Sequence, residues 1–317
     1  MAKKCIYILI STFITLKVVG QQDPQFTQYV FNQFYLNPGA AGIENKTRIQ
    51  TIFRSQYTGY TATADPGGSI LNQVFSANMP LGILKGGAGI YYANNKVSKV
   101  LTNQEIQLSY AYHYKLGGSI LGVGVSGGIH SKTLNGDAYI PRDPDDPFIP
   151  SDKIRQSALD ISTGVYLFNP GFQLGLSLKH INQPKFGFSN TGEGDYALNR
   201  SLYLTGSTLI GVTYTLDVSP MFVLKSDLKT ISPELGVLTT YDSKYWAGVN
   251  YRWEDAASFI IGGNFLNNSL RAGYAIDLVV FGTSAKAPMS HEILLTYTLA
   301  PPRSGKKSII RTPRYRF

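Results

Sequence analysis

Residues 105–130 read EIQLSYAYHYKLGGSILGVGVSGGIH, two alternating runs joined by Gly117-Gly118. A two-residue Gly-Gly loop supplies the positive φ angles of a primed hairpin turn, which pairs Leu116 with Ser119. In that register one face is almost wholly apolar and aromatic, and the other is polar or small. The turn and the hydrophobic pattern set the same register independently. We therefore predict an antiparallel strand pair here.

The same alternation recurs along most of the chain after Gly42. It predicts fourteen strands, most of them about 9–13 residues long, which suits tilted strands that cross a bilayer. The expected strands span residues 47–57, 69–79, 86–94, 103–116, 119–131, 157–168, 171–181, 200–214, 217–225, 232–241, 244–253, 257–265, 268–280 and 290–299.

The connections between these strands alternate in length. Short ones such as Asp242-Ser243 follow even-numbered strands, and long ones such as 182–199 follow odd-numbered strands. A soluble sandwich would also alternate, but short turns on one side and long loops on the other are typical of outer-membrane barrels, with the turns periplasmic. We predict an all-β fold: a single transmembrane antiparallel β-barrel over residues 47–299, with both chain ends on the periplasmic side.

Residues 1–20 have the features of a secretory signal peptide, with a basic start at Lys3 and Lys4 and a largely apolar stretch after it. Cys5 is the only cysteine, so we expect no disulfide and no cysteine chemistry in the mature chain. The formal net charge of +9 suggests contact with anionic surfaces, but export argues against nucleic acid as a partner. We expect the protein to lie in the outer membrane and to contact outer-membrane lipid.

The stretch QQDPQFTQYVFNQFYLNPGAAG, residues 21–42, does not alternate. Fourteen strands enclose a lumen too wide for the wall's own side chains to fill. We therefore predict that a segment over residues 21–46 plugs the lumen, with its aromatic side chains filling space and its amides bonded to inward polar groups. The expected plug residues are Phe26, Tyr29, Phe31, Phe34, Tyr35, Asn37 and Pro38.

Charged and histidine side chains fall at positions expected to face the lumen. We expect them to pair with one another or with the plug, because buried charge requires partners; a gating role is the alternative. The main candidates are Arg54, Glu105, His113, His130, Lys179, Arg252, Arg271, Asp277 and Glu292. Lys115 and Asp160 are expected to face inward as well.

Glu105 lies opposite His130 in the predicted hairpin, which makes this the one acid–base pair that the sequence places. It is interpreted as an ion pair inside the lumen, with a general base or a pH-sensitive latch as the alternative. No nucleophile motif or phosphate-binding loop accompanies it. We expect a protein that is not an enzyme and has no cofactor, and scattered histidines without cysteine disfavour a metal site.

Two further segments could bind partners. The proline-rich acidic loop 142–152 is interpreted as solvated or as a protein contact, with calcium as an alternative because hard cations prefer several oxygen ligands. The tail 300–317 has no acidic residue and is either disordered or a periplasmic docking strip for a partner or for anionic headgroups. Its basic residues are Arg303, Lys306, Lys307, Arg311, Arg314 and Arg316.

Several motifs, in this order and spacing, resemble the PorP/SprF family of type IX secretion outer-membrane proteins from Bacteroidota. The resemblance runs from Gln22 to about Leu299. The motifs are Gln22-Asp23-Pro24-Gln25-Phe26, Leu36-Asn37-Pro38, Ala41-Gly42, Leu108-Ser109-Tyr110-Ala111-Tyr112-His113, Trp246-Ala247-Gly248-Val249-Asn250-Tyr251-Arg252 with Asp255-Ala256, Gly273-Tyr274 with Asp277, and Ser290-His291-Glu292-Ile293. Gly39-Ala40 departs from the Ala-Tyr expected after Asn-Pro, which removes a wall contact by a tyrosine.

The resemblance implies a barrel that works with the type IX machinery in gliding or adhesive bacteria. It implies export or surface retention of a large adhesin that carries a C-terminal sorting domain, together with periplasmic lipoprotein components as partners. The alternative is a FadL-like or porin-like uptake channel with residues 21–42 as a movable hatch. A barrel enzyme is the weakest hypothesis, because no catalytic constellation is present.

Overall fold

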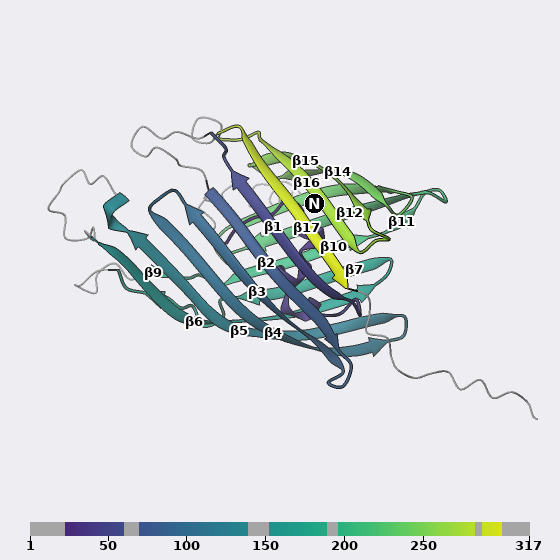
Figure 1. Cartoon of the computed structure of the whole chain (residues 1–317), viewed down its shortest axis with the longest axis horizontal. Helices are drawn as coiled ribbons and strands as arrows, with labels where there is room; N and C mark the ends of the chain where they lie inside the picture. Colours follow the sequence, from purple (N-terminus) through teal and green to yellow (C-terminus); the bar gives the residue numbers. More distant parts are fainter. Residues whose placement is uncertain (1–22, 60–69, 139–151, 189–195, 283–286, 300–317) are drawn as a thin grey trace, which may run out of the picture.

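The structure, a computed structural model, describes residues 23–59, 70–138, 152–188, 196–282 and 287–299. Its strands form an antiparallel sheet that closes where β10 pairs with β12, which gives the predicted 14-stranded barrel with strongly tilted strands (Figure 1). The wall consists of β1 (Thr47–Gln56), β2 (Ile70–Leu81), β3 (Gly86–Val97), β4 (Leu101–Leu116), β5 (Ser119–Asn135), β6 (Lys153–Asn169), β7 (Phe172–Lys179), β10 (Ser201–Thr208), β12 (Leu216–Ser226), β13 (Ile231–Tyr241), β14 (Tyr245–Arg252), β15 (Ala256–Phe265), β16 (Leu270–Val279) and β17 (Met289–Leu299).

All fourteen predicted strands are present, with one correction. The expected strand 200–214 is interrupted at Leu209, because β10 ends at Thr208 and the short β11 (Ile210–Gly211) continues the pairing with β12. The connection between β7 and β10 also holds a small hairpin that the sequence did not predict. This hairpin is β8 (Lys185–Phe186) with β9 (Tyr196–Ala197), and a short helical turn, η3 (Gly136–Ala138), follows β5.

The β4–β5 hairpin has the register predicted from its turn. Leu116 pairs with Ser119, and Gly117 has a φ of 57°. Leu108 is 63% exposed on the outer face, whereas the side chain of Gln107 beside it is fully buried on the inner face. The apolar face therefore points away from the lumen, as a membrane barrel requires and a soluble sandwich does not.

Large apolar and aromatic side chains are exposed around the outside of the wall, among them Phe53, Tyr112, Val249, Phe259 and Ile293. An outward band of this kind matches the hydrocarbon core of a bilayer. Among the described residues, no helix is both long and apolar enough to cross a membrane.

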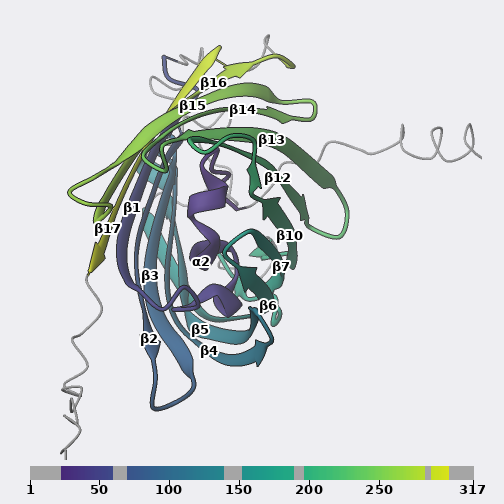
Figure 2. The ribbon, with the colours of Figure 1, turned by 90° about the vertical axis from the view of Figure 1, so that its right-hand side faces the viewer.

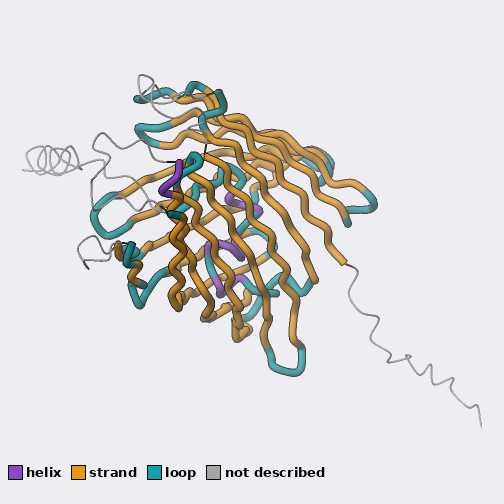
Figure 3. The backbone as a smooth tube through the Cα atoms, turned by 60° about the vertical axis from the view of Figure 1, so that its left-hand side comes forward, coloured by secondary structure: helices purple, strands orange, loops and turns teal. Residues whose placement is uncertain are grey.

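The described N-terminal segment, residues 23–46, lies inside the ring of strands (Figures 2 and 3). Its amides and its Asn-Pro break favour short turns over a long helix, and it forms η1 (Tyr29–Phe31), α2 (Gln33–Leu36) and η2 (Pro38–Ala40). Its side chains form the core of the molecule together with inward residues of the wall.

We call the end of the barrel with the short turns the turn end, and the opposite end the loop end. Asp23 contacts Tyr203 and Lys225, which lie near the loop end of β10 and β12. Gly42 contacts Asn78, which lies near the turn end of β2. The segment therefore crosses the lumen from the loop end to the turn end before it enters β1.

The expectation that both chain ends lie on the turn side falls on residues 1–22 and 300–317, outside the described residues. At the two limits of the described chain, Leu299 pairs with Thr47 at the turn end and Asp23 lies toward the loop end. The predicted signal peptide 1–20, residues 142–151 of the acidic loop and the basic tail 300–317 lie outside the described residues.

Candidate functional site in the barrel lumen

Aromatic side chains of the N-terminal segment pack against one another and against the wall. The rings of Phe26 and Tyr35 meet edge to face at 5.6 Å, and Tyr35 meets Tyr91 of β3 at 5.1 Å. The Lys179 ammonium lies 4.4 Å from the centre of the Tyr35 ring. Because aromatic pairs and cation–π contacts have preferred geometries, these contacts fix the position of the segment as well as filling space.

Inward side chains of the wall also form a buried ionic network. We call it the arginine cluster, which consists of Arg54, Glu234, Arg252, Asp277 and Glu292 from five different strands. Arg54 Nη2 lies 2.5 Å from Asp277 Oδ2, and Arg54 Nη1 lies 3.2 Å from Glu292 Oε2. Arg252 Nε lies 2.8 Å from Glu234 Oε2. Charges this deeply buried are tolerated only when they are paired and hydrogen-bonded.

Thr27 of the N-terminal segment completes the arginine cluster. Its hydroxyl donates to Asp277 Oδ1 at 2.7 Å and accepts from Arg54 Nη1 at 2.9 Å. Its backbone N–H donates to Glu292 at 2.8 Å, and its carbonyl accepts from Asn250 at 2.9 Å. The cluster therefore holds the segment through every polar group of one residue.

Asp23 forms a second polar attachment, nearer the loop end. It accepts hydrogen bonds from Tyr203 Oη at 2.7 Å and from His180 Nε2 at 3.0 Å, and its carbonyl accepts from Lys225 Nζ at 2.6 Å. Burial alone would raise the pKa of Asp23, but the positive charges of His180, Lys179 and Lys225 hold it well below the ordinary value.

His180 is positioned between two carboxylates directly after β7. Its Nδ1 lies 2.9 Å from Asp160 Oδ2, and its Nε2 lies 3.0 Å from Asp23 Oδ1. Burial would lower the pKa of His180, but the Asp23 carboxylate and the hydrogen bonds to Asp160 and Asp23 raise it to about 10. The imidazolium therefore joins the N-terminal segment to β6.

The Asn37-Pro38 turn seats the segment on the turn-end half of the wall. Asn37 Nδ2 donates to the carbonyls of Val165 and Leu176 at 2.9 and 3.2 Å, and Asn37 Oδ1 accepts from Gly39 N at 2.8 Å. A methyl group at Gly124 would overlap the backbone of Pro38. The wall glycine therefore allows a backbone-to-backbone contact that a larger residue would prevent.

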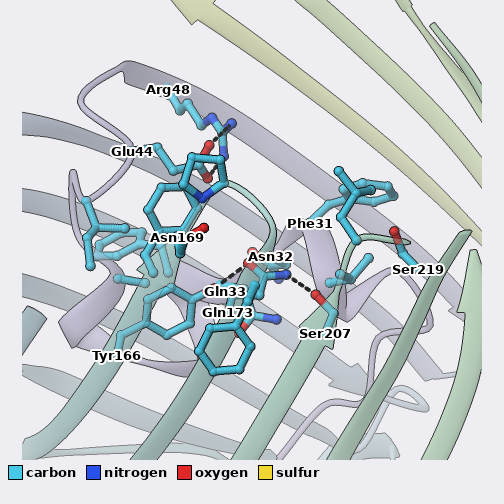
Figure 4. A pocket seen from close by; sticks show the side chains of 18 of the residues that line it. Phe31, Asn32, Gln33, Glu44, Arg48, Tyr166, Asn169, Gln173, Ser207 and Ser219 are labelled. Atoms are coloured by element: carbon cyan, nitrogen blue, oxygen red, sulfur yellow. Dashed lines mark hydrogen bonds and ion pairs between the residues drawn. The ribbon is translucent and has the colours of Figure 1, made fainter. Parts of the chain in front are cut away.

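The turn end of the lumen retains a cavity of about 260 Å³ between the segment and the wall (Figure 4). In it Glu44 and Arg48 form an ion pair, and Gln173 donates to Ser207 at 2.6 Å. Cavities that hold drug-sized ligands are about 300–1,000 Å³, so this one suits at most a small molecule.

A family model described as "Type IX secretion system membrane protein PorP/SprF" matches residues 18–297. The chain belongs to this family. The PorP/SprF match covers the lumen segment and almost all of the wall, and it places the barrel in the outer membrane. This is a family of secretion-system membrane proteins and not an enzyme family.

The PorP/SprF barrel is similar to several solved structures. The "CymD monoaromatic hydrocarbon channel" has a TM-score of 0.50 at 11% identity, over 84% of this chain and 91% of that one. The "Crystal structure of the Pseudomonas putida toluene transporter TodX" has a TM-score of 0.48 at 11% identity, over 84% and 92% of the two chains. At such low identity the likeness to CymD shows the fold alone. No curated protein matches the sequence.

The predicted Glu105–His130 pair requires a correction. The two residues face each other in the β4–β5 register, but Glu105 instead accepts from Tyr91 Oη at 2.5 Å and lies 3.5 Å from Lys179 Nζ. Neither ring nitrogen of His130 has a hydrogen-bond partner among the described residues. Glu105 pairs with Lys179 instead of His130 because a lysine ammonium compensates a buried carboxylate more strongly than a neutral imidazole does.

Expectations about four other lumen residues have mixed outcomes. Arg271 faces no carboxylate at contact distance among the described residues but stacks 4.7 Å from the Phe31 ring, while Lys115 is exposed. His113 Nε2 lies 2.9 Å from the carbonyl of Ala41. The side-chain amide of Gln28 has no partner in the described part of the chain, although its backbone N–H donates to Glu292.

The sequence analysis missed some of the residues that hold the segment. Glu234 precedes the outward apolar Leu235, so strand periodicity could have identified it as inward. Lys225 gives a weaker signal, because Leu224 precedes it but the buried polar Ser226 follows it. Thr27 and Asp23 carry no periodic signal, because the segment around them is irregular. Only the folded structure brings Thr27 to Arg54 and Asp23 to His180.

Proposed function

We propose that this PorP/SprF barrel supports the export and surface anchoring of one large adhesin-type substrate, whose C-terminal sorting domain it binds. Family membership supports a role with the type IX machinery. The periplasmic lipoprotein components and the substrate are the partners of this proposal. The short turns face the periplasm in it, in the usual orientation of outer-membrane barrels.

The observation that carries the proposal is the filled lumen. Thr27 ties the N-terminal segment to the arginine cluster, and Asn37 ties it to β6 and β7. The cavity of about 260 Å³ that remains is far too small for a polypeptide domain. A substrate would therefore contact the surface of this barrel and not pass through it while the segment is in place.

Docking from the periplasm would use the turn end and the basic tail after Leu299. The last described strand, β17, ends at the turn end, next to the start of β1. Six basic residues follow it in the sequence, and an exported basic strip suits acidic partner surfaces or anionic headgroups.

Gene deletion combined with surface proteomics tests the proposal. One large adhesin should disappear from the cell surface and accumulate inside the cell or in the medium, and the wild-type gene should restore its display. Co-purification from native membranes should recover that adhesin with the barrel. Normal display of every large surface protein in the deletion strain would contradict the proposal.

A small-solute uptake channel is the second candidate. It is favoured by the shared fold with the CymD channel and by the turn-end cavity, part of whose lining is the aromatic pair Tyr166 and Phe168. Reconstitution of the intact protein into liposomes decides between the two. Rapid and selective uptake of one solute class into the liposomes supports the channel. Absence of solute uptake supports the anchoring role.

A further inference from the structure

Three metal-ligating side chains converge at the loop-end half of the lumen. We call His130 of β5, Asp160 of β6 and His180 after β7 the histidine cluster. Each offers one ligand atom, and these atoms all lie within 4.8 Å of one another. His130 is 6% exposed, and Asp160 and His180 are fully buried. The cluster is separate from the arginine cluster and from the turn-end cavity.

The histidine cluster has polar atoms without partners. Both ring nitrogens of His130 and Asp160 Oδ1 make no hydrogen bond within the described residues. An unsatisfied buried polar group costs about 1–3 kcal/mol, so three in one place require a physical explanation. An ion bound between them would engage one ring nitrogen of His130 and a carboxylate oxygen of Asp160.

The surroundings are those of metal ligands. His180 Nε2 lies 3.0 Å from Asp23 Oδ1, which leaves Nδ1 facing Asp160. Asp160 Oδ2 accepts from Gln107 Nε2 at 2.8 Å. Ligating imidazoles generally donate their second N–H to a carboxylate, and ligating carboxylates are themselves hydrogen-bonded.

The local charge also favours a cation. The imidazole of His180 lies between the Asp23 and Asp160 carboxylates. A divalent ion between His130, Asp160 and His180 would be compensated directly by Asp160 and, through the His180 ring, by Asp23.

The geometry points to a divalent transition-metal site formed by His130, Asp160 and His180, with Zn²⁺ as the probe ion. Two imidazoles and one carboxylate suit zinc and its first-row neighbours and disfavour calcium and magnesium. Bonds of about 2.0–2.2 Å require the ligand atoms to approach one another, and no hydrogen bond among the described residues holds the His130 ring away from the other two side chains.

A small cavity of about 20 Å³ adjoins His130 and Glu105, and its volume is enough for one water molecule. Because Asp23 contacts His180, the bound metal also strengthens the attachment of the N-terminal segment to the wall.

Metal content of the purified barrel tests the site. The full mature chain, without an affinity tag and stripped with a chelator, is equilibrated with Zn²⁺ in detergent, desalted and assayed by mass spectrometry. We expect about one zinc per chain, as for a single closed site. The thermal midpoint should rise with zinc, because a ligand that binds only the folded state stabilises it.

His130→Ala is the decisive variant, since His130 makes no hydrogen bond whose loss would disturb the fold. It should lose both the bound zinc and the zinc-dependent rise in the thermal midpoint. Asp23→Asn should weaken zinc affinity about 10–100-fold, the usual effect of changing a carboxylate behind a ligating histidine.

His291→Ala is the matched control, because His291 pairs with Tyr274 on the outer face of β17 at 2.7 Å. It should bind zinc like the wild type. The site does not exist if the wild-type chain stays zinc-free, or if His130→Ala retains the wild-type stoichiometry. Equal loss in the His291 variant would also overturn it, by placing the zinc elsewhere.

Discussion

Thr27 shows how one small residue can position a whole segment. Its hydroxyl lies between Arg54 and Asp277, so it both accepts from a cation and donates to an anion. Hydrogen bonds to charged groups contribute about 1.5–3 kcal/mol, more than those between neutral groups. The side chain is fully buried, so water cannot replace it at this position.

Thr27→Val should therefore destabilise the protein by about 1–3 kcal/mol, because it keeps the shape of the side chain and removes both hydroxyl hydrogen bonds. Chemical denaturation in lipid vesicles measures the change. Thr27→Ser, which keeps the hydroxyl, is the control and should lie within about 1 kcal/mol of the wild type. A valine variant as stable as the wild type would contradict the role given to Thr27.

Asp227 lies in the turn between β12 and β13 at the loop end. It accepts from Lys229 N at 3.0 Å, Thr230 N at 2.7 Å and Thr230 Oγ1 at 2.9 Å. Partial burial would raise the pKa of Asp227, but the hydrogen bonds from Thr230 and Lys229 lower it below its ordinary value of 3.8.

Since the folded-state pKa of Asp227 is lowered, its contribution to turn stability is present above the ordinary value and is lost as the pH falls through and below it. Hydrogen exchange at the amide of Thr230, corrected for the intrinsic pH dependence, should show less protection at pH 3 than at pH 7. Asp227→Asn keeps an acceptor oxygen and should show no such pH dependence. Equal protection of the wild-type amide at both pH values would refute the prediction.

At the scale of elements, the wall and the N-terminal segment fit together through their backbones. Pro38 of η2 lies against Gly124 of β5, and Gly39 lies against Gly122. The glycines of β5 keep the alternating pattern of a strand, and they also leave room for the backbone of η2. Packing at this density leaves little tolerance for added atoms.

Gly124→Val should displace the Asn37–Gly42 turn and loosen the segment, because its side chain would occupy the position of Pro38. Limited proteolysis should cut the segment at least several-fold faster than in the wild type, as expected for a local opening equilibrium. Gly127→Ala lies on the same strand with nothing within 4 Å of the added atom, and it should behave like the wild type. Identical protection in both variants would argue against this contact.

For the whole molecule, the wall closes through its own strands. The β10–β12 and β1–β17 pairings complete the ring, and neither involves residues 23–46. The segment therefore controls what the lumen contains, whereas the backbone hydrogen bonds of the wall keep the barrel closed.

A mature chain that lacks residues 21–42 should still form a heat-resistant barrel but conduct ions. Planar-bilayer recordings should show conductance several-fold above that of the intact protein, because a 14-stranded lumen without its filling is wide enough for water. The intact chain, recorded in the same lipid, is the reference. Indistinguishable conductance would mean that the segment does not obstruct the lumen.

The sequence by itself determined the wall. Period-two alternation and turn chemistry are local properties, so residues 105–130 alone fixed the register in which Leu116 pairs with Ser119. The interruption of the strand at Leu209 was not predicted, although the alternation is locally broken there by the adjacent apolar residues Leu209 and Ile210.

Only the tertiary structure decided which polar groups meet inside the barrel. The β4–β5 register placed Glu105 opposite His130, yet Lys179 from β7 became the partner of Glu105. Inward side chains from many strands compete in one lumen, and desolvation favours the strongest charge compensation among them. His130 was thereby left beside Asp160 and His180, in contacts that no local pattern along the chain specifies.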